Sequence, residues 1–424
     1  MKEKLNYLSG FNNYFNTEAQ AGALPTDQNN PQNCPMDLFA EQLSGTAFTA
    51  PRAKNKKSWL YKLKPSVIDK EFKLIESHLF LTPDFSNNTH LPTPMRWDPM
   101  EYPSKPTSFI ESLTTYVGNG NPKTKSGCAI HLYACNQPME DTYFYNSDGD
   151  FLVVPQEGEL LIKSEFGLLS VTPSEVIIIP RGIKFQIDLP EKKSRGYVCE
   201  NFGSPFELPE LGPIGANGLA NPRDFLSPVA WHEEKKGTFK LQTKFLGNLF
   251  ETNLNQSPLN VVAWHGNYYP YKYDLKKFNT INTVSFDHPD PSIFTVLTSP
   301  SAISGTANID FVIFPPRWMV AENTFRPPYY HRNTMSEFMG LIHGIYDAKQ
   351  TGFTPGGASL HNCMSPHGPD KDTFQKASQE KLKPEHQDNT LAFMLETNLP
   401  FQISDYANKT PLRQKDYLTC WKGL

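Results

Sequence analysis

The sequence predicts a mainly β protein that contains two antiparallel β-sandwich domains. Proline is abundant, at 37 of 424 residues, and aromatic residues reach 12%; together they favour short strands and ordered loops over long helices. Short apolar runs are separated by turn residues at close intervals, a rhythm typical of an antiparallel sandwich or barrel. Two blocks of such runs follow one another along the chain. Their similar rhythm favours a duplicated domain, although no repeat aligns them.

The segment 1–60 is expected to form an extended N-terminal arm. It lacks apolar periodicity and is rich in Asn, Gln, Pro and Gly, so it cannot bury much surface by itself. Its aromatic side chains favour an arm that docks on another surface over a disordered tail; they are Tyr14, Phe15, Phe39 and Phe48.

The two strand-rich blocks define the expected domains 61–280 and 281–424. Strands of the first block are expected at 58–63, 129–134, 151–155, 159–163, 167–171, 176–180 and 184–187. Strands of the second block are expected at 294–298, 309–314, 336–342 and 391–396. Helices are expected near 245–255 and over 371–383.

The composition excludes several functional classes. A net charge of −4 provides neither the basic surface that nucleic acid requires nor a field that would hold the chain to an anionic membrane. The six cysteines contain no C-x-x-C pair, which fits neither a disulfide framework nor a cysteine-based zinc site. We therefore expect a cytoplasmic protein in a reducing compartment that binds neither nucleic acid nor membrane.

Histidine carries most of the chemistry that the sequence suggests. Of eleven histidines, five lie between residues 288 and 367. The Walker loop, the dinucleotide-binding G-x-G-x-x-G, the G-x-S-x-G elbow and the H-E-x-x-H motif are missing. The chemistry must therefore come from side chains that the fold brings together.

Glu337 is the acidic residue that stands out beside these histidines. The expected strand places Glu337 on the same face as Met339 and Leu341, which should be buried. A buried carboxylate is costly unless a cation or several donors meet it. His331 can reach the same point because the turn-like residues 332–334 allow the chain to change direction.

A third ligand would complete a metal site of two histidines and one carboxylate. His367, held between a proline and a glycine, is the better candidate from the downstream loop, which also contains His361. This ligand set suits non-haem Fe(II) with open positions, and the absence of thiolates argues against a closed structural zinc site. Two alternatives remain: His343 shares the expected strand face of Glu337, and Glu337 could instead pair with Arg332 or Arg317.

Longer motifs resemble the homogentisate 1,2-dioxygenase family nearly from end to end. The most specific are FRPPYYHRNTMSEFMGLI at 325–342 and PGGASLHNCMSPHGPD at 355–370. Further matching segments lie at 22–25, 31–35, 40–52, 58–61, 179–182, 260–268, 271–275, 286–288 and 314–318. One departure is Asn12, where the family usually has glycine.

The resemblance implies a fold and a set of site residues. It implies a pair of cupin-like β-sandwich or jelly-roll domains, of which only the C-terminal one holds iron, since Phe185 stands where a histidine ligand would be expected in the first. The implied metal ligands are His331, Glu337 and His367. The implied general acid/base is His288, and the implied substrate contacts are Tyr346, His367 and His361.

The resemblance also implies a reaction and an assembly. The reaction is cleavage of the ring of homogentisate by O2 to 4-maleylacetoacetate, with Fe(II) as cofactor, in the breakdown of tyrosine and phenylalanine. The assembly is a homotrimer or a hexamer made of two trimers. The alternatives are another metal-dependent cupin enzyme, such as a gentisate-type dioxygenase or an isomerase, and a non-catalytic cupin that binds or stores a ligand.

Overall fold

The structure is a computed structural model that describes residues 5–69, 71–77, 79–215, 219–281, 285–346, 348–349 and 351–424. The prediction of a mainly β chain is confirmed. Within the described residues, α-helix is confined to α1 (Phe109–Ser112), α2 (Lys371–Gln379) and α3 (Asp405–Lys409). No helix among these residues is long and apolar enough to cross a membrane.

Two large sheets form the N-terminal part of the molecule. The nine-stranded sheet runs β1 (Tyr7–Ser9), β16 (Phe225–Pro228), β20 (Tyr271–Asp274), β13 (Glu175–Ile179), β10 (Asp150–Glu157), β15 (Ser194–Asn201), β8 (Ser126–Cys135), β7 (Thr114–Asn121) and β28 (Gln402–Ile403). The seven-stranded sheet runs β12 (Gly167–Val171), β11 (Leu160–Ser164), β14 (Phe185–Asp188), β9 (Thr142–Asn146), β17 (Lys236–Phe245), β18 (Asn248–Gln256) and β5 (Lys73–Ile75).

The C-terminal part is built on a six-stranded sheet. Its order is β21 (Thr295–Pro300), β22 (Ala307–Phe314), β27 (Thr390–Thr397), β24 (Ser336–Gly344), β25 (Ala358–His361) and β6 (Met95–Trp97). A two-stranded ribbon of β23 (Arg317–Met319) and β26 (Glu385–Gln387) lies beside it. Because β6 and β28 each join the sheet of the other part, the two parts exchange strands; the boundaries expected at 60 and 280 stay predictions.

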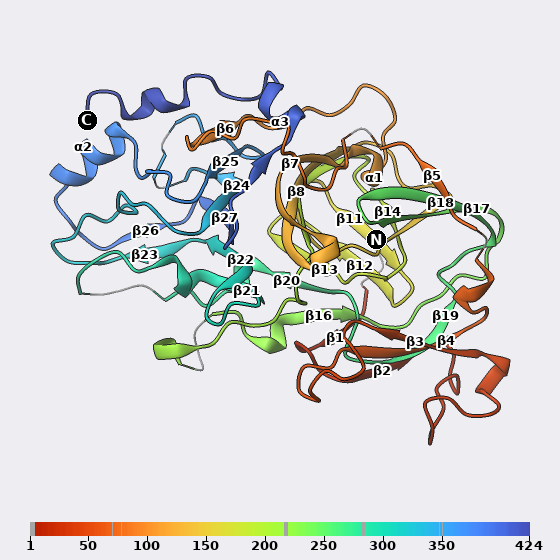
Figure 1. Ribbon diagram of the computed structural model, residues 1–424. Coiled ribbons are helices and arrows are strands. Elements are labelled where there is room, and N and C mark those ends of the chain that lie inside the picture. Colours follow the sequence, from red (N-terminus) through yellow and green to blue (C-terminus); the bar gives the residue numbers. More distant parts are fainter. Residues whose placement is uncertain are drawn as a thin grey trace.

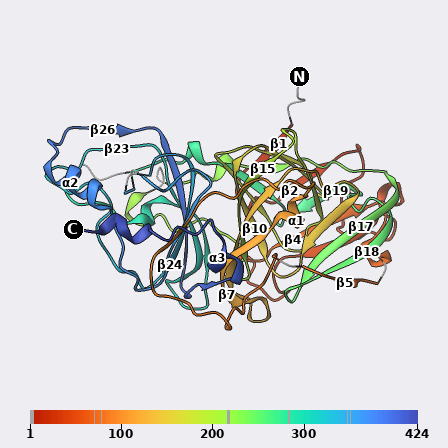
Figure 2. The same cartoon turned by 90° about the horizontal axis from the view of Figure 1, so that it is seen from above.

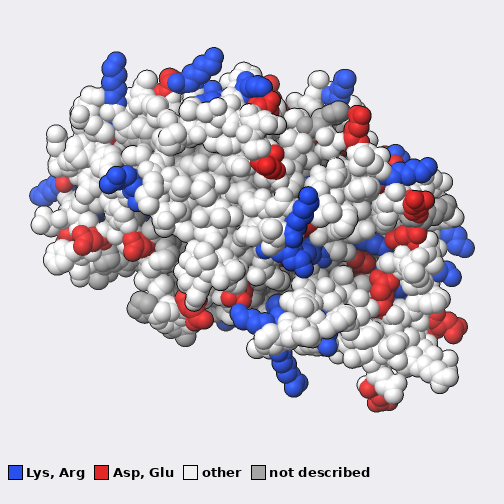
Figure 3. Space-filling model, viewed as in Figure 1, with Lys and Arg blue, Asp and Glu red and all other residues white. Residues whose placement is uncertain are grey.

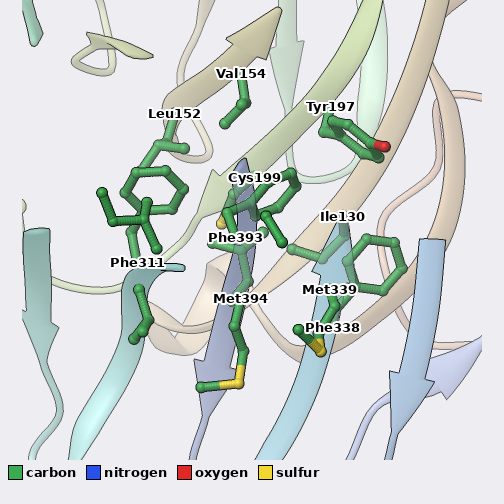
Figure 4. Packing of buried hydrophobic residues seen from close by; sticks show 14 of the residues in the cluster. Ile130, Leu152, Val154, Tyr197, Cys199, Phe311, Phe338, Met339, Phe393 and Met394 are labelled. Atoms are coloured by element: carbon green, nitrogen blue, oxygen red, sulfur yellow. The ribbon is translucent and has the colours of Figure 1, made fainter. Parts of the chain in front are cut away.

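The nine-stranded sheet is the middle layer of the molecule and is buried on both faces. In β10, Phe151 and Val153 belong to the core shared with the seven-stranded sheet. The alternating residues Leu152 and Val154 belong to the core that also contains residues of the six-stranded sheet, and Figure 4 shows them beside the aromatic and sulfur-containing side chains of that sheet. The six-stranded sheet and the seven-stranded sheet therefore lie at opposite ends of the molecule (Figures 1 and 2).

Both-face burial explains the composition of the central strands. A strand with one exposed face alternates apolar and polar residues, whereas a strand buried on both faces reads as a continuous apolar run. The runs Phe151–Val154 and Val176–Ile179 are of the second kind, and all their side chains are buried.

The arm forms short strands on the same chain. β1 pairs with β16, and a four-stranded sheet has the order β2 (Phe15–Glu18), β19 (Val261–Gly266), β4 (Lys57–Lys62) and β3 (Phe39–Ser44). The Phe15 ring packs against Tyr269 with centroids 5.3 Å apart, whereas Phe48 is 85% exposed. Asn12 has a φ of 59°, the left-handed conformation that glycine also provides and that asparagine tolerates better than most residues.

The helix expected near 245–255 is wrong. Leu246 and Gly247 both have positive φ, and they turn the chain into a hairpin in which β18 pairs antiparallel with β17. The strands expected elsewhere are confirmed as β4, β8, β10 to β14, β21, β22, β24 and β27. The helix expected over 371–383 is confirmed as α2, although it ends at Gln379; the side chain of Asp370 caps it by accepting from the Thr373 amide at 2.8 Å.

Charge is spread over the visible surface. Figure 3 shows acidic and basic side chains scattered over a mostly uncharged face. This distribution agrees with the small net charge of the chain.

Candidate metal centre

A cavity of about 430 Å³ lies against the six-stranded sheet of the C-terminal part. Strands β24 and β25 provide its floor, and the loops around residues 288–292 and 328–333 provide its walls. The lining includes all the site residues expected from the sequence, namely His288, His331, Glu337, Tyr346, His361 and His367.

Three of these side chains bring their ligand atoms within 4.8 Å of one another: His331, Glu337 and His367. Glu337 lies near the start of β24 and is 4% exposed. His367 Nε2 lies 3.0 Å from one carboxylate oxygen of Glu337, and His331 Nε2 lies 3.6 Å from the other. The two histidine backbones also form a reciprocal bridge, with N–H···O distances of 3.0 and 3.1 Å. The chain therefore does turn between His331 and Glu337.

Backbone carbonyl groups set the tautomers of both histidines. The Nδ1–H of His331 donates to the Tyr329 carbonyl at 2.8 Å, and the Nδ1–H of His367 donates to the Ser365 carbonyl at 2.9 Å. A carbonyl can only accept, so each Nδ1 carries a proton, and in the neutral imidazole the lone pair is then on Nε2. Such hydrogen bonds orient the histidine ligands of metal sites.

The electrostatics of Glu337 also fit a cation. Burial raises the pKa of Glu337, but the interactions with the imidazoles of His331, His361 and His367 outweigh burial and hold the pKa of Glu337 well below its usual range. The carboxylate in turn raises the pKa of His331. An ionised, buried carboxylate that faces two imidazole lone pairs is a donor set for a divalent metal. The residues present therefore fit a metal cofactor.

The two alternatives for this cluster have no support in the geometry. The ion pairs that the structure gives Glu337 are to histidines rather than to Arg332 or Arg317. A register shift in the β24–β27 pairing lies between Leu341 and His343, and His343 is not among the residues that line the cavity.

His361 lies directly behind the three-residue cluster. Its ring stacks on the His367 ring with centroids 4.0 Å apart and planes 9° apart. Its Nδ1 lies 3.8 Å from Glu337, and its Nε2 lies 3.1 Å from the Tyr417 hydroxyl. Burial, followed by repulsion from His367, lowers the pKa of His361 to about 4. Both nitrogens therefore face protein groups, and contact of His361 with substrate stays a prediction.

His288 and Tyr346 occupy other walls of the cavity. The Nδ1–H of His288 donates to the Pro289 carbonyl at 2.8 Å, which makes Nε2 the basic nitrogen. The ring of Tyr346 lies edge-on between two phenylalanine rings, with centroid distances of 5.6 Å to Phe314 and 6.1 Å to Phe353. The cavity lining therefore combines an imidazole, that of His288, with the aromatic rings around Tyr346.

The sequence reasoning missed two of the cations that line this cavity, Arg96 and Lys349. Arg96 comes from β6, far earlier in the chain, and its guanidinium lies 4.3 Å from the centre of the Tyr417 ring. Lys349 is 6% exposed, and its Nζ donates to the Gly368 carbonyl at 2.8 Å; burial lowers the pKa of Lys349 to about 8. No local pattern marks either residue: Arg96 reaches the site through the pairing of β6 with β25, and Lys349 lies in the loop that follows β24.

A second carboxylate near the cluster was also missed. The Asn333 amide donates to Glu337 at 3.2 Å and to Glu396 at 2.5 Å. Burial, followed by repulsion from Glu337, raises the pKa of Glu396 to about 7. Asn333 thus bridges the ionised carboxylate of Glu337 and the carboxyl group of Glu396, which is protonated more readily.

A β-sandwich chain with this donor set in a cavity belongs to the class of metal-dependent enzymes. Comparison with protein families makes the class specific. The family model described as homogentisate 1,2-dioxygenase N-terminal matches residues 6–275, and the model described as homogentisate 1,2-dioxygenase C-terminal matches residues 276–424. The chain therefore belongs to the homogentisate 1,2-dioxygenase family.

This membership establishes the reaction. The enzyme is a ring-cleaving dioxygenase that uses O2 to convert homogentisate to 4-maleylacetoacetate in tyrosine and phenylalanine catabolism, with a metal cofactor. It decides against the gentisate-type dioxygenase, isomerase and storage alternatives.

Distant solved structures were also found. Protein Ylba from E. coli is 9% identical over 73% of this chain and 92% of its own, with a TM-score of 0.30. A cupin 2 conserved barrel domain protein from Leptotrichia buccalis is 8% identical over 67% of this chain and 88% of its own, with a TM-score of 0.28. A single-substitution variant of the oxalate decarboxylase of Bacillus subtilis is 14% identical over 76% of this chain and 80% of its own, with a TM-score of 0.29. Similarity at this level carries no argument about this chain.

Proposed function

We propose that the metal of this enzyme is Fe(II), bound by His331, Glu337 and His367. The observation that carries this proposal is the convergence of two imidazole Nε2 lone pairs and one ionised carboxylate in a cavity. Two imidazoles with one carboxylate and no thiolate are the ligands that suit non-haem Fe(II) with open positions.

The residues around this cluster would then bind the substrate and transfer its proton. Bound Fe(II) would supply open coordination positions for the substrate and O2, together with redox chemistry. His288 would accept the proton of a ring hydroxyl at Nε2, since an imidazole titrates near neutral pH. Tyr346 and His367 would contact the substrate ring, and His361 could donate to a ring hydroxyl only by giving up one of its protein contacts.

The charge of the cavity lining supports an anionic substrate. Homogentisate carries a carboxylate on its side chain, and the lining includes Arg96, Arg332 and Lys349. A cation in a partly buried site attracts an anion more strongly than it would in water. Phenylalanine and methionine side chains complete the lining and match an aromatic ring; they are Phe314, Met339, Phe353 and Met394.

An oxygen electrode and a metal assay test the cofactor together. Protein purified anaerobically and loaded with Fe(II) should consume one O2 per homogentisate and form 4-maleylacetoacetate, whereas the metal-free protein should consume none. Protein loaded with Zn(II) is the control, because zinc occupies such sites without redox chemistry. Full oxygen uptake by zinc-loaded or metal-free protein would contradict the iron proposal.

We also propose that the chain assembles into a homotrimer or a hexamer of two trimers, in the cytoplasm. Large apolar side chains that are strongly exposed in the single chain support further contacts, among them Phe48 at 85% and Val67 at 88%. Light scattering should give the mass of three or six 48.0-kDa chains. A mass of one chain at micromolar concentration would exclude the assembly.

A further inference from the structure

The C-terminal segment of the chain reaches the rear of the candidate metal centre. It ends in the 3₁₀ helix η8 (Tyr417–Trp421). Tyr417 is 3% exposed, and its hydroxyl lies 3.1 Å from His361 Nε2. We propose that Tyr417 is a positioning residue, whose hydroxyl holds His361 in the tautomer that presents Nδ1–H to Glu337 and so holds this carboxylate in place for the metal. This inference rests on the proposed metal site.

Hydrogen-bond chemistry decides between the two tautomers of His361. A neutral imidazole has one proton. If Nε2 carried it, the lone pair of Nδ1 would face the Glu337 carboxylate at 3.8 Å, and two negative poles would oppose each other. If the Tyr417 hydroxyl donates to Nε2, the proton is on Nδ1 and faces the carboxylate. Nδ1 of His361 is buried and has no hydrogen-bond partner within the part of the chain that the structure describes. The acceptor that its N–H faces is therefore the Glu337 carboxylate.

The strand register places His361 next to Glu337, so the tautomer of His361 determines what faces the carboxylate. β24 and β25 are antiparallel neighbours, and Glu337 lies directly opposite His361. His361 also stacks on His367, so it touches two of the three proposed ligands at once. The register sets the position of the His361 backbone. The tautomer of its ring depends on a hydrogen-bond partner, which is the Tyr417 hydroxyl.

Several contacts hold Tyr417 itself in place. Arg96 lies over one face of the ring, and the Trp421 ring packs with its centroid 5.3 Å away. The Trp421 indole N–H donates to the Pro369 carbonyl at 3.0 Å, close to His367 in the chain. The backbone N–H of Gln414 donates to the backbone carbonyl of Arg96 at 2.9 Å. These contacts fix the position of the hydroxyl, which is what a positioning role requires.

The test removes the hydroxyl and keeps the ring. Tyr417→Phe should weaken Fe(II) binding by up to about 10–100-fold, the usual effect of losing the outer partner of a metal ligand, because His361 would no longer be held with Nδ1–H toward Glu337. The affinity is measured anaerobically by competition with a chromophoric chelator. Tyr273→Phe is the matched control, since Tyr273 is equally buried and its hydroxyl has no hydrogen-bond partner among the described residues; it should leave the affinity unchanged.

A second variant isolates the path through His361. In a His361→Leu background, Tyr417→Phe should cause no further loss of Fe(II) affinity, because the group that it orients is gone. A full additional loss in that background, or wild-type affinity in the single Tyr417→Phe variant, would overturn the inference. Glu337→Ala separates this outcome from failure of the metal site: if Glu337→Ala loses iron while Tyr417→Phe keeps it, the site stands and only the role of Tyr417 falls.

Discussion

Replacing Glu337 with alanine is expected to remove the metal and all turnover while the β-sandwich stays folded. Glu337 is the only anionic member of the three-residue cluster, and the two imidazoles that remain would carry no charge to offset that of a divalent cation. The melting temperature should fall modestly, because the variant loses the interactions with the imidazoles that hold the pKa of Glu337 low but keeps the apolar core of the sandwich. Metal analysis, calorimetry and oxygen uptake on one preparation measure the three quantities.

His343→Ala is the matched control for this experiment. His343 lies on the same strand, β24, and was the rival ligand on the sequence evidence, but it does not line the cavity. Its removal should leave metal content and turnover nearly unchanged. If His343→Ala lost the metal, or if Glu337→Ala kept full occupancy, the proposed ligand set would be wrong.

The sequence predicted the central part of this site because the relevant signals are local. Glu337 follows the two-residue period of its strand, and a carboxylate among methionine and leucine requires a partner. The turn-like residues 332–334 allow the chain to reverse, so His331 can approach Glu337. Each of these inferences uses only neighbours along the chain.

The rear of the site depends on long-range pairing and could not be predicted in this way. Arg96 reaches the cavity because β6 adds to the edge of the six-stranded sheet next to β25. Tyr417 reaches His361 because the last residues fold back behind β25. No periodicity in either segment indicates a partner that is far away in the sequence.

The same limit applies to the fold. The continuous apolar run at Val176–Ile179 correctly predicted a strand. The run could not indicate that both faces of this strand are covered, one by the seven-stranded sheet and the other by the six-stranded sheet. The incorrect helix near 245–255 arose because the turn at Leu246 and Gly247 was overlooked, although glycine commonly provides positive φ in hairpin turns.

Among the residues of the cavity, His288 has the surroundings of a base rather than of a ligand. It lies in a loop stiffened by Pro289 and Pro291, and its ring packs edge-on near Tyr329 with centroids 6.1 Å apart. It is not part of the cluster whose ligand atoms converge. A third imidazole on the metal would also close a position that the substrate or O2 needs.

His288→Phe should therefore keep iron near wild-type occupancy and lose about 10²–10⁴-fold in turnover, the usual contribution of a positioned acid or base. Phenylalanine preserves the edge-on aromatic packing against Tyr329, so melting should not account for the loss. A purely structural loop histidine would behave differently, since its rate would fall only in proportion to stability. Iron content, melting temperature and turnover measured on one preparation decide between the two. Normal turnover, or loss of iron, would each defeat the assignment of His288 as the general base.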